Sequence, residues 1–487
     1  MKKLSELYKG YPDILISDIK TNSKEVKKGD LFVCIKGVTT DRNKFINEAI
    51  DHGAKALVTN LNIKTKVPVI HVNNPNKELA NICSKFYNYP QDKLDLIGIT
   101  GTNGKTSVAS IIKNLIGKDC GYLGTNGIIC TKFSKKISNT TPNSDKLFKY
   151  LDMFYKANCK YISMEASSEA LLYNRLNKIK FKVAIITNIT SDHLNVHKTI
   201  RNYVSCKERI LNHIKKDGLL ILNSDDKYFK EIKNKTNNRV LTYGKNQSNL
   251  KIIDFKEYIN KTDITLEYKN KLYNIVSPLL GEFNVYNLCA GILTLSCFGY
   301  TIEEVIEKIP DIKTPKGRME FIKNNKGYYI IIDYAHTPDA FIKVYNFLNK
   351  VKKGRIITVT GSAGGRDHMK RGEMGKIILD NSLYAIFTMD DPRNEDVNSI
   401  IDDLVSDSDK TNYKRIIDRK EAIKHALSLA TKDDIILIAG KGDDNYMAIG
   451  DKYLGYSDRE VVKNIIDSMY HMWYRIINNY SDKLNKY

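Results

Sequence analysis

The residues with the clearest chemical potential form the run Gly-Ile-Thr-Gly-Thr-Asn-Gly-Lys-Thr-Ser at positions 98–107. An apolar run at 94–100 leads into it, and a stretch with helical apolar spacing, 107–116, follows, which predicts a strand, a glycine loop and a helix. The N–H groups of such a loop and the positive end of the helix bind phosphate oxygens. We therefore expect seven residues to bind nucleotide phosphates: Gly101, Thr102, Asn103, Gly104, Lys105, Thr106 and Ser107.

Two side chains of this loop carry specific chemistry. Lys105 can reach the β- and γ-phosphates, and the Thr106 hydroxyl can hold Mg²⁺. Ile99 stands where a strict Walker A sequence has glycine, so a glycine turn without function is the alternative. The order of strand, Gly-Lys-Thr and helix favours the phosphate loop. A phosphate loop alone is compatible with a kinase, a GTPase or a ligase.

The composition describes an ordinary globular protein. The chain has 487 residues, 42% hydrophobic and 27% charged, which excludes collagen-like and wholly disordered proteins. It contains no run of about 18 apolar residues and no apolar signal-peptide core near its start, so we expect a cytoplasmic location and no membrane partner. Its eight cysteines are scattered singly, which suits reduced thiols.

The charge is strongly positive but diffuse. Lysine and arginine (77) exceed aspartate and glutamate (56), which gives a net charge of +21. The lysines are spread along the whole chain, so we expect no nucleic-acid partner. A positive field also favours a substrate that carries phosphate. A basic phosphate-loop protein that binds nucleic acid without catalysis stays as an alternative.

The order of predicted elements indicates an α/β protein of three domains, at about 150 residues per domain. A small α/β unit covers 1–88, a central unit of alternating strands and helices covers 89–315, and a second doubly wound unit covers 316–487. Predicted strands lie at 30–37, 56–58, 94–100, 161–164, 183–187, 219–222, 329–332, 355–359, 385–387 and 435–438, and a first-domain helix at 45–53. We expect the tail, 468–487, to form a packing helix, with a partner contact as the alternative.

The run at 100–107 resembles the ATP loop of the Mur ligases, ATP-dependent amide-forming enzymes of peptidoglycan synthesis, and the resemblance covers almost the whole chain. The motifs are most similar to those of the member that adds the third residue to UDP-N-acetylmuramoyl-L-alanyl-D-glutamate. The resemblance implies an N-terminal domain for the uridine nucleotide, a central P-loop ATPase-like parallel sheet and a C-terminal Rossmann-like domain. It also implies a cytoplasmic protein, which we expect to be a monomer.

The resemblance implies that five residues bind the UDP substrate: Ser23, Thr140, Thr141, Ser168 and Arg175. The family usually has aspartate and arginine where Asn22 and Lys24 stand, and histidine where Glu169 stands. These departures concern the substrate contacts.

The resemblance also implies two Mg²⁺ ions, held by Thr106, Glu165, His193 and Lys207, with Lys105, His193 and Lys207 as catalytic residues. Lys207 would act as a carbamate, whose negative charge can position Mg²⁺. The alternative for Lys207 is an unmodified surface lysine. The alternative for Glu165 is a solvated carboxylate without a metal. A carboxylate at a strand end beside a phosphate loop is a suitable oxygen ligand.

Further motifs resemble the ATP and amino-acid contacts of the family. Asn287, Arg318 and Asp333 would bind ATP between the central and C-terminal domains, with Asp333 on the ribose. The implied amino-acid site consists of Arg366, Asp390, Asp391, Arg393, Gly440 and Asp444.

The amino acid is predicted from Arg393. Members that select meso-diaminopimelate usually have Asp-Asn-Pro-Arg there, and the arginine grips the distal carboxylate bidentately. Arg393 therefore favours meso-diaminopimelate, with L-lysine possible. Asp391 in place of asparagine adds a negative charge, and Asp443-Asp444 replaces the usual His-Glu, which shortens the carboxylate for the distal ammonium.

The expected reaction joins this amino acid to D-glutamate through an acyl phosphate made from ATP. A folylpolyglutamate synthetase-like ligase is a weaker alternative, because that relative lacks the N-terminal unit at 1–88. A Mur ligase paralogue that uses an unusual amine is another, in view of Glu169, Asp391 and Asp444.

Overall fold

The computed structural model describes residues 1–36, 41–192 and 194–468. These divide into two compact units. The first unit contains 1–189, 201–250 and 288–305, and the second contains 190–200, 251–287 and the chain from 306 onward. His193 and the tail beyond residue 468 lie outside the described residues.

The first unit begins with a small parallel sheet, in the order β3-β4-β5-β6. Its strands are β3 (Ile19–Lys20), β4 (Leu31–Val33), β5 (Ala56–Thr59) and β6 (Val69–His71). The helices here are α1 (Leu4–Leu7), α2 (Ile46–Asp51) and α3 (Pro75–Phe86), and β1 (Lys2–Lys3) pairs with β2 (Leu15–Ile16). The predicted strand–helix–strand order is confirmed, although the strand predicted at 30–37 is shorter.

The first unit contains most of a large sheet, in which its strands are neighbours in the order β10-β9-β8-β11-β7-β12-β13-β14. Its strands are β7 (Asp95–Thr100), β8 (Cys120–Gly124), β9 (Gly127–Ile129), β10 (Ser134–Lys135), β11 (Tyr161–Glu165), β12 (Phe181–Ile186), β13 (Ile214–Asn223) and β14 (Arg239–Gly244). The neighbouring strands β8, β11, β7, β12, β13 and β14 are parallel. The edge strands β9 and β10 are antiparallel additions. Leu96, Ile97 and Ile99 of β7 are fully buried, as a strand covered on both faces requires.

Helix α4 (Lys105–Ile116) follows the glycine loop directly. Val108, Ile111, Ile112 and Leu115 are buried along one stripe of it, which is the spacing that predicted the helix. The helix begins two residues before the predicted start. The other helices of this part are α5 (Ser144–Lys156), α6 (Ser168–Leu172), α8 (Ile200–Glu208), α9 (Phe229–Lys233) and α11 (Ile302–Ile306), and α10 (Glu282–Ser296) spans the division between the units.

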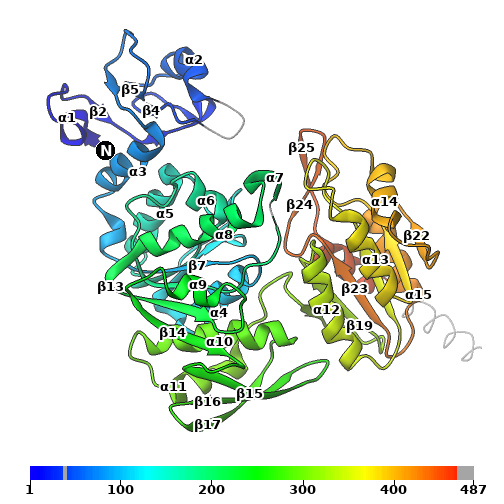
Figure 1. The fold of residues 1–487 in the computed structure, drawn as a ribbon. Helices are drawn as coiled ribbons and strands as arrows, with labels where there is room; N and C mark the ends of the chain where they lie inside the picture. The colour runs from blue at the N-terminus through cyan, green and yellow to red at the C-terminus, as the bar shows by residue number, and fades with distance from the viewer. Residues whose placement is uncertain (37–40, 193, 469–487) are drawn as a thin grey trace, which may run out of the picture. The chain divides into compact units, whose positions relative to one another are not determined.

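The second unit is built on the sheet β18-β19-β23-β20-β21-β22, of which β19, β22 and β23 are labelled in Figure 1. Its strands are β18 (Glu320–Ile322), β19 (Tyr329–Asp333), β20 (Ile356–Thr360), β21 (Tyr384–Phe387), β22 (Tyr413–Arg415) and β23 (Ile435–Ala439). All are parallel except the edge strand β18. The predicted Rossmann-like arrangement is confirmed.

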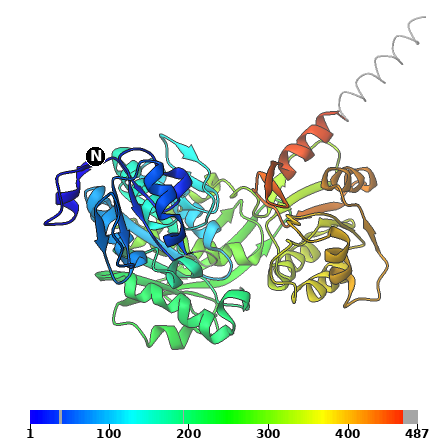
Figure 2. The same cartoon turned by 90° about the horizontal axis from the view of Figure 1, so that it is seen from above.

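Helices cover both faces of this sheet. One core packs α12 (Pro338–Val351), α13 (Arg371–Asn381) and α14 (Val397–Val405) against the strands. The other contains α15 (Arg419–Leu429) and the helical residues 458–468, drawn in red in Figure 2. The unit also includes β15 (Leu250–Glu257), the hairpin of β16 (Thr262–Tyr268) with β17 (Lys271–Ser277), and β24 (Tyr446–Ile449) paired with β25 (Lys452–Gly455). Across the described residues, the structure has no helix with the length and apolarity of a membrane span.

Candidate active site

Three neighbouring strands of the first unit end at the phosphate loop. β7 lies between β11 and β12, with Glu165 opposite Ile99 and Ile186 opposite Thr100. The carboxyl ends of adjacent parallel strands form one edge, which is where open α/β sheets bind ligands. The fold therefore brings the loop, the Glu165 carboxylate and the residues after β12 together, as the sequence predicted for the first two.

The backbone of the loop depends on glycine and on one asparagine. Gly101 has a φ of +149° and Gly104 a φ of +85°, and a Cβ on Gly101 would overlap the Thr187 hydroxyl. Asn188 holds the loop from the next strand: its carbonyl accepts from the Thr102 N–H at 2.8 Å, and its Oδ1 accepts from the Asn103 N–H at 3.0 Å. This role of Asn188 was not predicted from the sequence.

Lys105 lies folded over the loop. Its Nζ donates to the carbonyl oxygens of Gly101 and Thr102, both at 2.9 Å. The ammonium is thereby kept at the mouth of the phosphate loop, where a triphosphate is expected to bind.

Glu165 is fully buried, so the alternative of a solvated carboxylate is excluded. Its Oε1 accepts from the Tyr122 hydroxyl at 2.6 Å and from the Thr125 N–H at 2.9 Å. Its Oε2 accepts from the Thr106 hydroxyl at 3.0 Å. Gly124 permits this packing, because a Cβ there would overlap Oε1. The roles of Tyr122 and Thr125 were missed.

The Thr106–Glu165 pair fits Mg²⁺. Both donors are oxygens, and Mg²⁺ typically takes one or two protein ligands and completes its shell with water and phosphate. Among the residues that the structure describes, no group of three or more His, Cys, Asp or Glu side chains is arranged to hold a metal. His193 lies outside the described residues.

Lys207 is buried rather than on the surface, with 1% of the residue exposed. Its Nζ donates to the Gly101 carbonyl at 2.7 Å and lies 4.5 Å from the centre of the Tyr203 ring. The alternative of a surface lysine is therefore wrong. A carbamate on Nζ keeps one N–H, so the contact to Gly101 is compatible with the modification.

Three of the predicted UDP-substrate residues lie close to Glu165. The Thr141 hydroxyl donates to the Glu165 carbonyl at 2.7 Å, and Thr140 Oγ1 lies 3.0 Å from Thr125 Oγ1. Arg175 Nη1 donates to the Thr141 carbonyl at 3.0 Å. Glu169, which replaces the usual histidine, lies 3.8 Å from Arg175 and partly compensates its charge.

The other two UDP-substrate residues have internal roles in the structure. Ser168 is 5% exposed at the start of α6, and its carbonyl accepts from the Cys206 thiol. Ser23 is 2% exposed, and its hydroxyl donates to Glu48 Oε2 at 2.8 Å. The predicted contact of Ser23 with uracil therefore requires its hydroxyl to serve a second partner.

In the second unit, Asp333 ends β19 and organises the Arg318 loop. Its two oxygens accept from the N–H groups of Met319 at 2.6 Å and Ala335 at 2.8 Å. Burial raises the pKa of Asp333, and the Arg318 charge opposes this. The Arg318 guanidinium lies 4.4 Å from the centre of the Tyr334 ring. A carboxylate has about four acceptor positions, so a ribose hydroxyl can still be bound.

Asn287 lies on α10 and is 5% exposed. Its amide donates to Asn284 Oδ1 at 2.9 Å, and Asn284 in turn donates to the Leu280 carbonyl. The side chain is held in one orientation before any ligand binds.

Asp391 is compensated by a buried lysine. Lys441 Nζ lies 2.8 Å from Asp391 Oδ1 and 3.7 Å from Asp390 Oδ1, and the lysine is fully buried. The Ala448 N–H also donates to Asp391 Oδ1, at 2.9 Å. The expectation that Asp391 simply adds negative charge to the site is therefore corrected, because Lys441 supplies the opposite charge.

The remaining predicted amino-acid residues are also on the carboxyl side of this sheet. Arg393 has a φ of +52°, and its Nη1 donates to the Gly364 carbonyl at 2.7 Å. Arg366 is exposed. Gly440 follows β23 with no room for a Cβ, which would overlap the Asp390 carboxylate. Burial raises the pKa of Asp444 to about 6, Asp391 and Asp390 add to this shift, and Lys441 opposes it.

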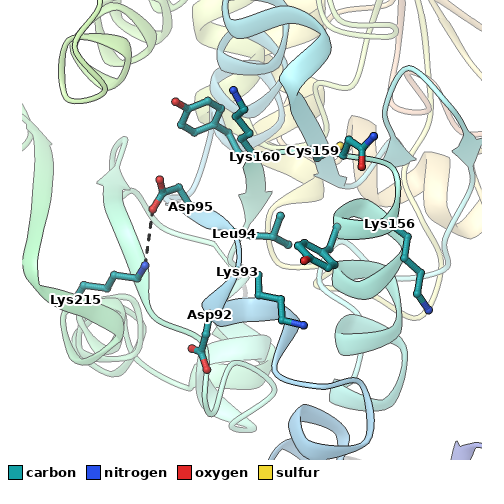
Figure 3. A pocket seen from close by; sticks show the side chains of 11 residues that line it. Asp92, Lys93, Leu94, Asp95, Lys156, Cys159, Lys160 and Lys215 are labelled. Atoms are coloured by element: carbon teal, nitrogen blue, oxygen red, sulfur yellow. Dashed lines mark ion pairs between the residues drawn. The ribbon is translucent and has the colours of Figure 1, made fainter.

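A hollow of about 650 Å³ lies away from these residues (Figure 3). Its lining includes Asp95 and Tyr161, the first residues of β7 and β11, whereas the phosphate loop follows the last residue of β7. Lys215 and Asp95 form an ion pair of 3.8 Å across part of it. This hollow is at the amino end of the strands and is therefore separate from the candidate site.

The fold, the phosphate loop and the buried Glu165 define a nucleotide-dependent ligase, and the chain belongs to the Mur ligase family. Three family models match: the catalytic domain of the family at 15–90, the middle domain at 99–295 and the glutamate ligase domain at 317–442. The analysed chain is similar to the UDP-N-acetylmuramoyl-L-alanyl-D-glutamate–2,6-diaminopimelate ligase of Bacillus cereus, with 37% identity over 93% of this chain and 94% of the relative. The enzyme of the same name from Caldanaerobacter subterraneus is 36% identical over 96% of this chain and 98% of the relative.

Solved structures of Mur ligases have the same fold as this chain. A structure of a ligase of that name superimposes with a TM-score of 0.66 and 28% identity, and covers 97% of this chain and all of that one. A MurF ligase from Thermotoga maritima in complex with ADP has a TM-score of 0.67 at 21% identity, with 88% of this chain and 95% of that one covered. The latter likeness concerns the fold alone.

Proposed function

We propose that this chain joins meso-diaminopimelate to D-glutamate in UDP-N-acetylmuramoyl-L-alanyl-D-glutamate and converts ATP to ADP and phosphate. The observation that carries this proposal is the 37% identity to the diaminopimelate ligase over 93% of the chain. The placement of the phosphate loop against Glu165 and Lys207 supports it, because this chemistry must stabilise a phosphoryl group in transfer.

In the first step, the γ-carboxylate of D-glutamate attacks the γ-phosphorus of ATP, and ADP leaves. Lys105 and the loop N–H groups bind the phosphates, while Thr140, Thr141 and Arg175 orient the muramoyl dipeptide. Thr106, Glu165, His193 and carbamylated Lys207 would hold two Mg²⁺ ions, which supply positive charge for the phosphoryl oxygens when bound. Asn287, Arg318 and Asp333 would bind the rest of the nucleotide.

In the second step, the amine of the amino acid attacks the carbonyl carbon of the acyl phosphate. The C–O bond to phosphate breaks, phosphate leaves with the electron pair, and the amine loses a proton to solvent. Arg366 would hold the carboxylate beside the reacting amine. Both steps gain rate from fixing the reactants in line.

Arg393 supports meso-diaminopimelate over L-lysine. Its guanidinium can bind a distal carboxylate bidentately, and L-lysine has none. Asp444 would bind the distal ammonium. Asp390 and Asp391 support this arrangement through Lys441, which compensates their charge.

The test is ADP release by the full chain with ATP, Mg²⁺ and the UDP-muramoyl dipeptide against a panel of amino acids. We expect meso-diaminopimelate to be preferred over L-lysine by at least about a hundredfold in kcat/KM, because L-lysine would leave the partly buried Arg393 guanidinium without its carboxylate partner. Preference for L-lysine would refute the Arg393 argument. If no amino acid of the panel supports turnover, or if ATP is not consumed, the proposed function is refuted.

The alternative ligase class has weaker support. A folylpolyglutamate synthase structure from Mycobacterium tuberculosis covers 75% of this chain at 17% identity, which shows the shared fold alone. The family match at 15–90 lies in the N-terminal unit that this class was expected to lack.

We also propose a cytoplasmic monomer with domain boundaries at 1–88, 89–315 and 316–487. The eight cysteines, all free and seven of them buried, suit a reducing compartment. Substrates in this reaction are a nucleotide-linked peptide, an amino acid and ATP, without nucleic acid or a membrane.

A further inference from the structure

We infer that Arg459 is a positioning residue that couples two loops of the second unit, an inference that rests on the proposed function. The first is the nucleotide loop, residues 317–320, which carries Arg318. The second is the amino-acid loop, residues 440–444, which carries Asp444. Arg459 itself comes from the helical segment 458–468, outside both loops.

Arg459 binds a carboxylate from each loop. Its Nε donates to Glu320 Oε1 at 2.9 Å, and its Nη2 donates to Glu320 Oε2. Its Nη1 donates to Asp443 Oδ1 at 3.1 Å. The exposed fractions of the three side chains are 20%, 17% and 15%, so solvent screens these ion pairs only partly. The planar guanidinium can hold two carboxylates in one fixed geometry, which an ammonium cannot.

Each carboxylate is tied to the backbone that it must position. Glu320 Oε2 also accepts from the Gly317 N–H at 2.7 Å, which closes the nucleotide loop around Arg318. Asp443 directly precedes Asp444, whose N–H donates to the Lys441 carbonyl at 2.9 Å. A displacement of Asp443 would therefore move Asp444.

The two loops are also in direct contact. A Cβ on Gly317 would overlap the backbone of Gly442 and Asp443, so the loops approach as closely as glycine allows. A shift of one loop must displace the other. Arg459 keeps this contact closed through its two ion pairs.

The residue before Arg459 fixes the other end of the amino-acid loop. Asp458 accepts from Arg419 Nε at 2.8 Å and from Arg419 Nη2 at 2.9 Å, and both residues are buried. Arg419 Nη2 also donates at 2.7 Å to the carbonyl of Ala439, which directly precedes the loop. The start of this helix thus holds the amino-acid loop at both ends.

This arrangement accounts for Asp443, which stands where the family usually has histidine. An acidic residue at this position completes the pairing with Arg459, which already binds Glu320. The additional negative charge of Asp443 joins the two loops. Asp443 has no direct role in the choice of amino acid.

The test separates the two sides of the coupling. Arg459→Met is expected to raise KM for ATP and KM for diaminopimelate, each about tenfold, the cost of one partly buried charged hydrogen bond. Asp443→Asn should raise mainly KM for diaminopimelate, and Glu320→Gln mainly KM for ATP. Compared with Arg459→Met, the Arg459→Lys variant should partly restore only one of the two KM values, because an ammonium cannot hold both carboxylates in the same geometry. A kcat loss greater than the KM effects would contradict a positioning role.

The matched control is Arg355→Met. Arg355 donates to both oxygens of Asp434 at 3.1 Å from Nε, and it precedes β20, at the amino edge of the same sheet. Arg355→Met should lower the thermal midpoint of unfolding about as much as Arg459→Met does, and it should leave both KM values unchanged. If Arg459→Met also leaves both KM values within about twofold of wild type, or matches Arg355→Met in every measurement, the inference is wrong. Absence of amino-acid-dependent ADP release by wild type would instead overturn the proposed function.

Discussion

The Lys207→Ala variant is expected to lose at least about a thousandfold in kcat, because it removes the group that would carry a carbamate beside the phosphate loop. The buried Nζ contacts the Gly101 carbonyl, so the lysine lies directly against the phosphate loop. The measurement is ADP release under saturating ATP, dipeptide and diaminopimelate. We expect the binding of ATP to weaken much less than kcat falls.

Chemical rescue distinguishes a carbamate from an ammonium. A short carboxylic acid such as acetate should restore part of the activity of Lys207→Ala, because it supplies a carboxylate in the space that the side chain leaves. An alkylamine should restore none. Lys216→Ala, which changes an exposed lysine of β13, serves as the control and should retain wild-type kcat. Rescue by the amine alone, or undiminished kcat in Lys207→Ala, would end the carbamate hypothesis.

The Asp444→Asn variant is expected to lose about a hundredfold in kcat/KM for diaminopimelate, because a charged hydrogen bond to the distal ammonium is worth about 2–3 kcal/mol. The effect should depend on pH. Since burial raises the pKa of Asp444 to about 6, the carboxylate that binds the ammonium is protonated below that pH. The ratio of kcat/KM between wild type and Asp444→Asn should therefore rise tenfold per pH unit up to about 6 and level off above it.

The ratio is the appropriate quantity because deprotonation of the reacting amine affects both proteins equally and cancels. The pH dependence of stability should have the opposite sign: the free energy of unfolding of the wild type should fall as Asp444 ionises. A folded-state pKa above the ordinary carboxyl value means that ionisation of Asp444 disfavours the folded state as pH rises from about 4 to 6. Asp444→Asn should therefore not lower the thermal midpoint at pH 7.5. A ratio that is constant from pH 5 to 7.5 would contradict the proposed role.

The phosphate loop and its surroundings could be predicted because the signals are local. Glycines at 101 and 104 permit positive φ, and the apolar residues of α4 recur at helical spacing. Glu165 was placed correctly because it ends a buried strand parallel to β7. Strand ends of a parallel sheet converge whatever the sequence between them, so the motif order was sufficient.

The partners of these residues could not be predicted, because they are set by tertiary packing. Tyr122 lies 43 positions from Glu165, and Asn188 lies 85 positions from Asn103. Neither side chain carries a local pattern that indicates such a contact. The antiparallel strands β9, β10, β16 and β17 were also missed, since an alternating α/β pattern indicates parallel strands first.

The departures from the family pattern were interpreted incompletely from the sequence. Asp391 was expected to add a negative charge to the site, and the sequence did not indicate that Lys441, 50 positions away, pairs with it in the structure. Asp443 pairs in the same way with Arg459, 16 positions away. A charge substitution can be evaluated only when its spatial neighbours are known, because the free energy of a buried charge depends on whether it is paired.

The step on which the proposed function depends is the activation of a substrate carboxylate by transfer of the γ-phosphoryl group of ATP. It is tested most directly with UDP-muramoyl dipeptide whose γ-carboxyl oxygens are labelled with ¹⁸O, in the presence of ATP and diaminopimelate. We predict that each phosphate released contains one ¹⁸O atom, which is transferred when the acyl phosphate breaks. Phosphate released without the label, while the amide product forms, would contradict the account.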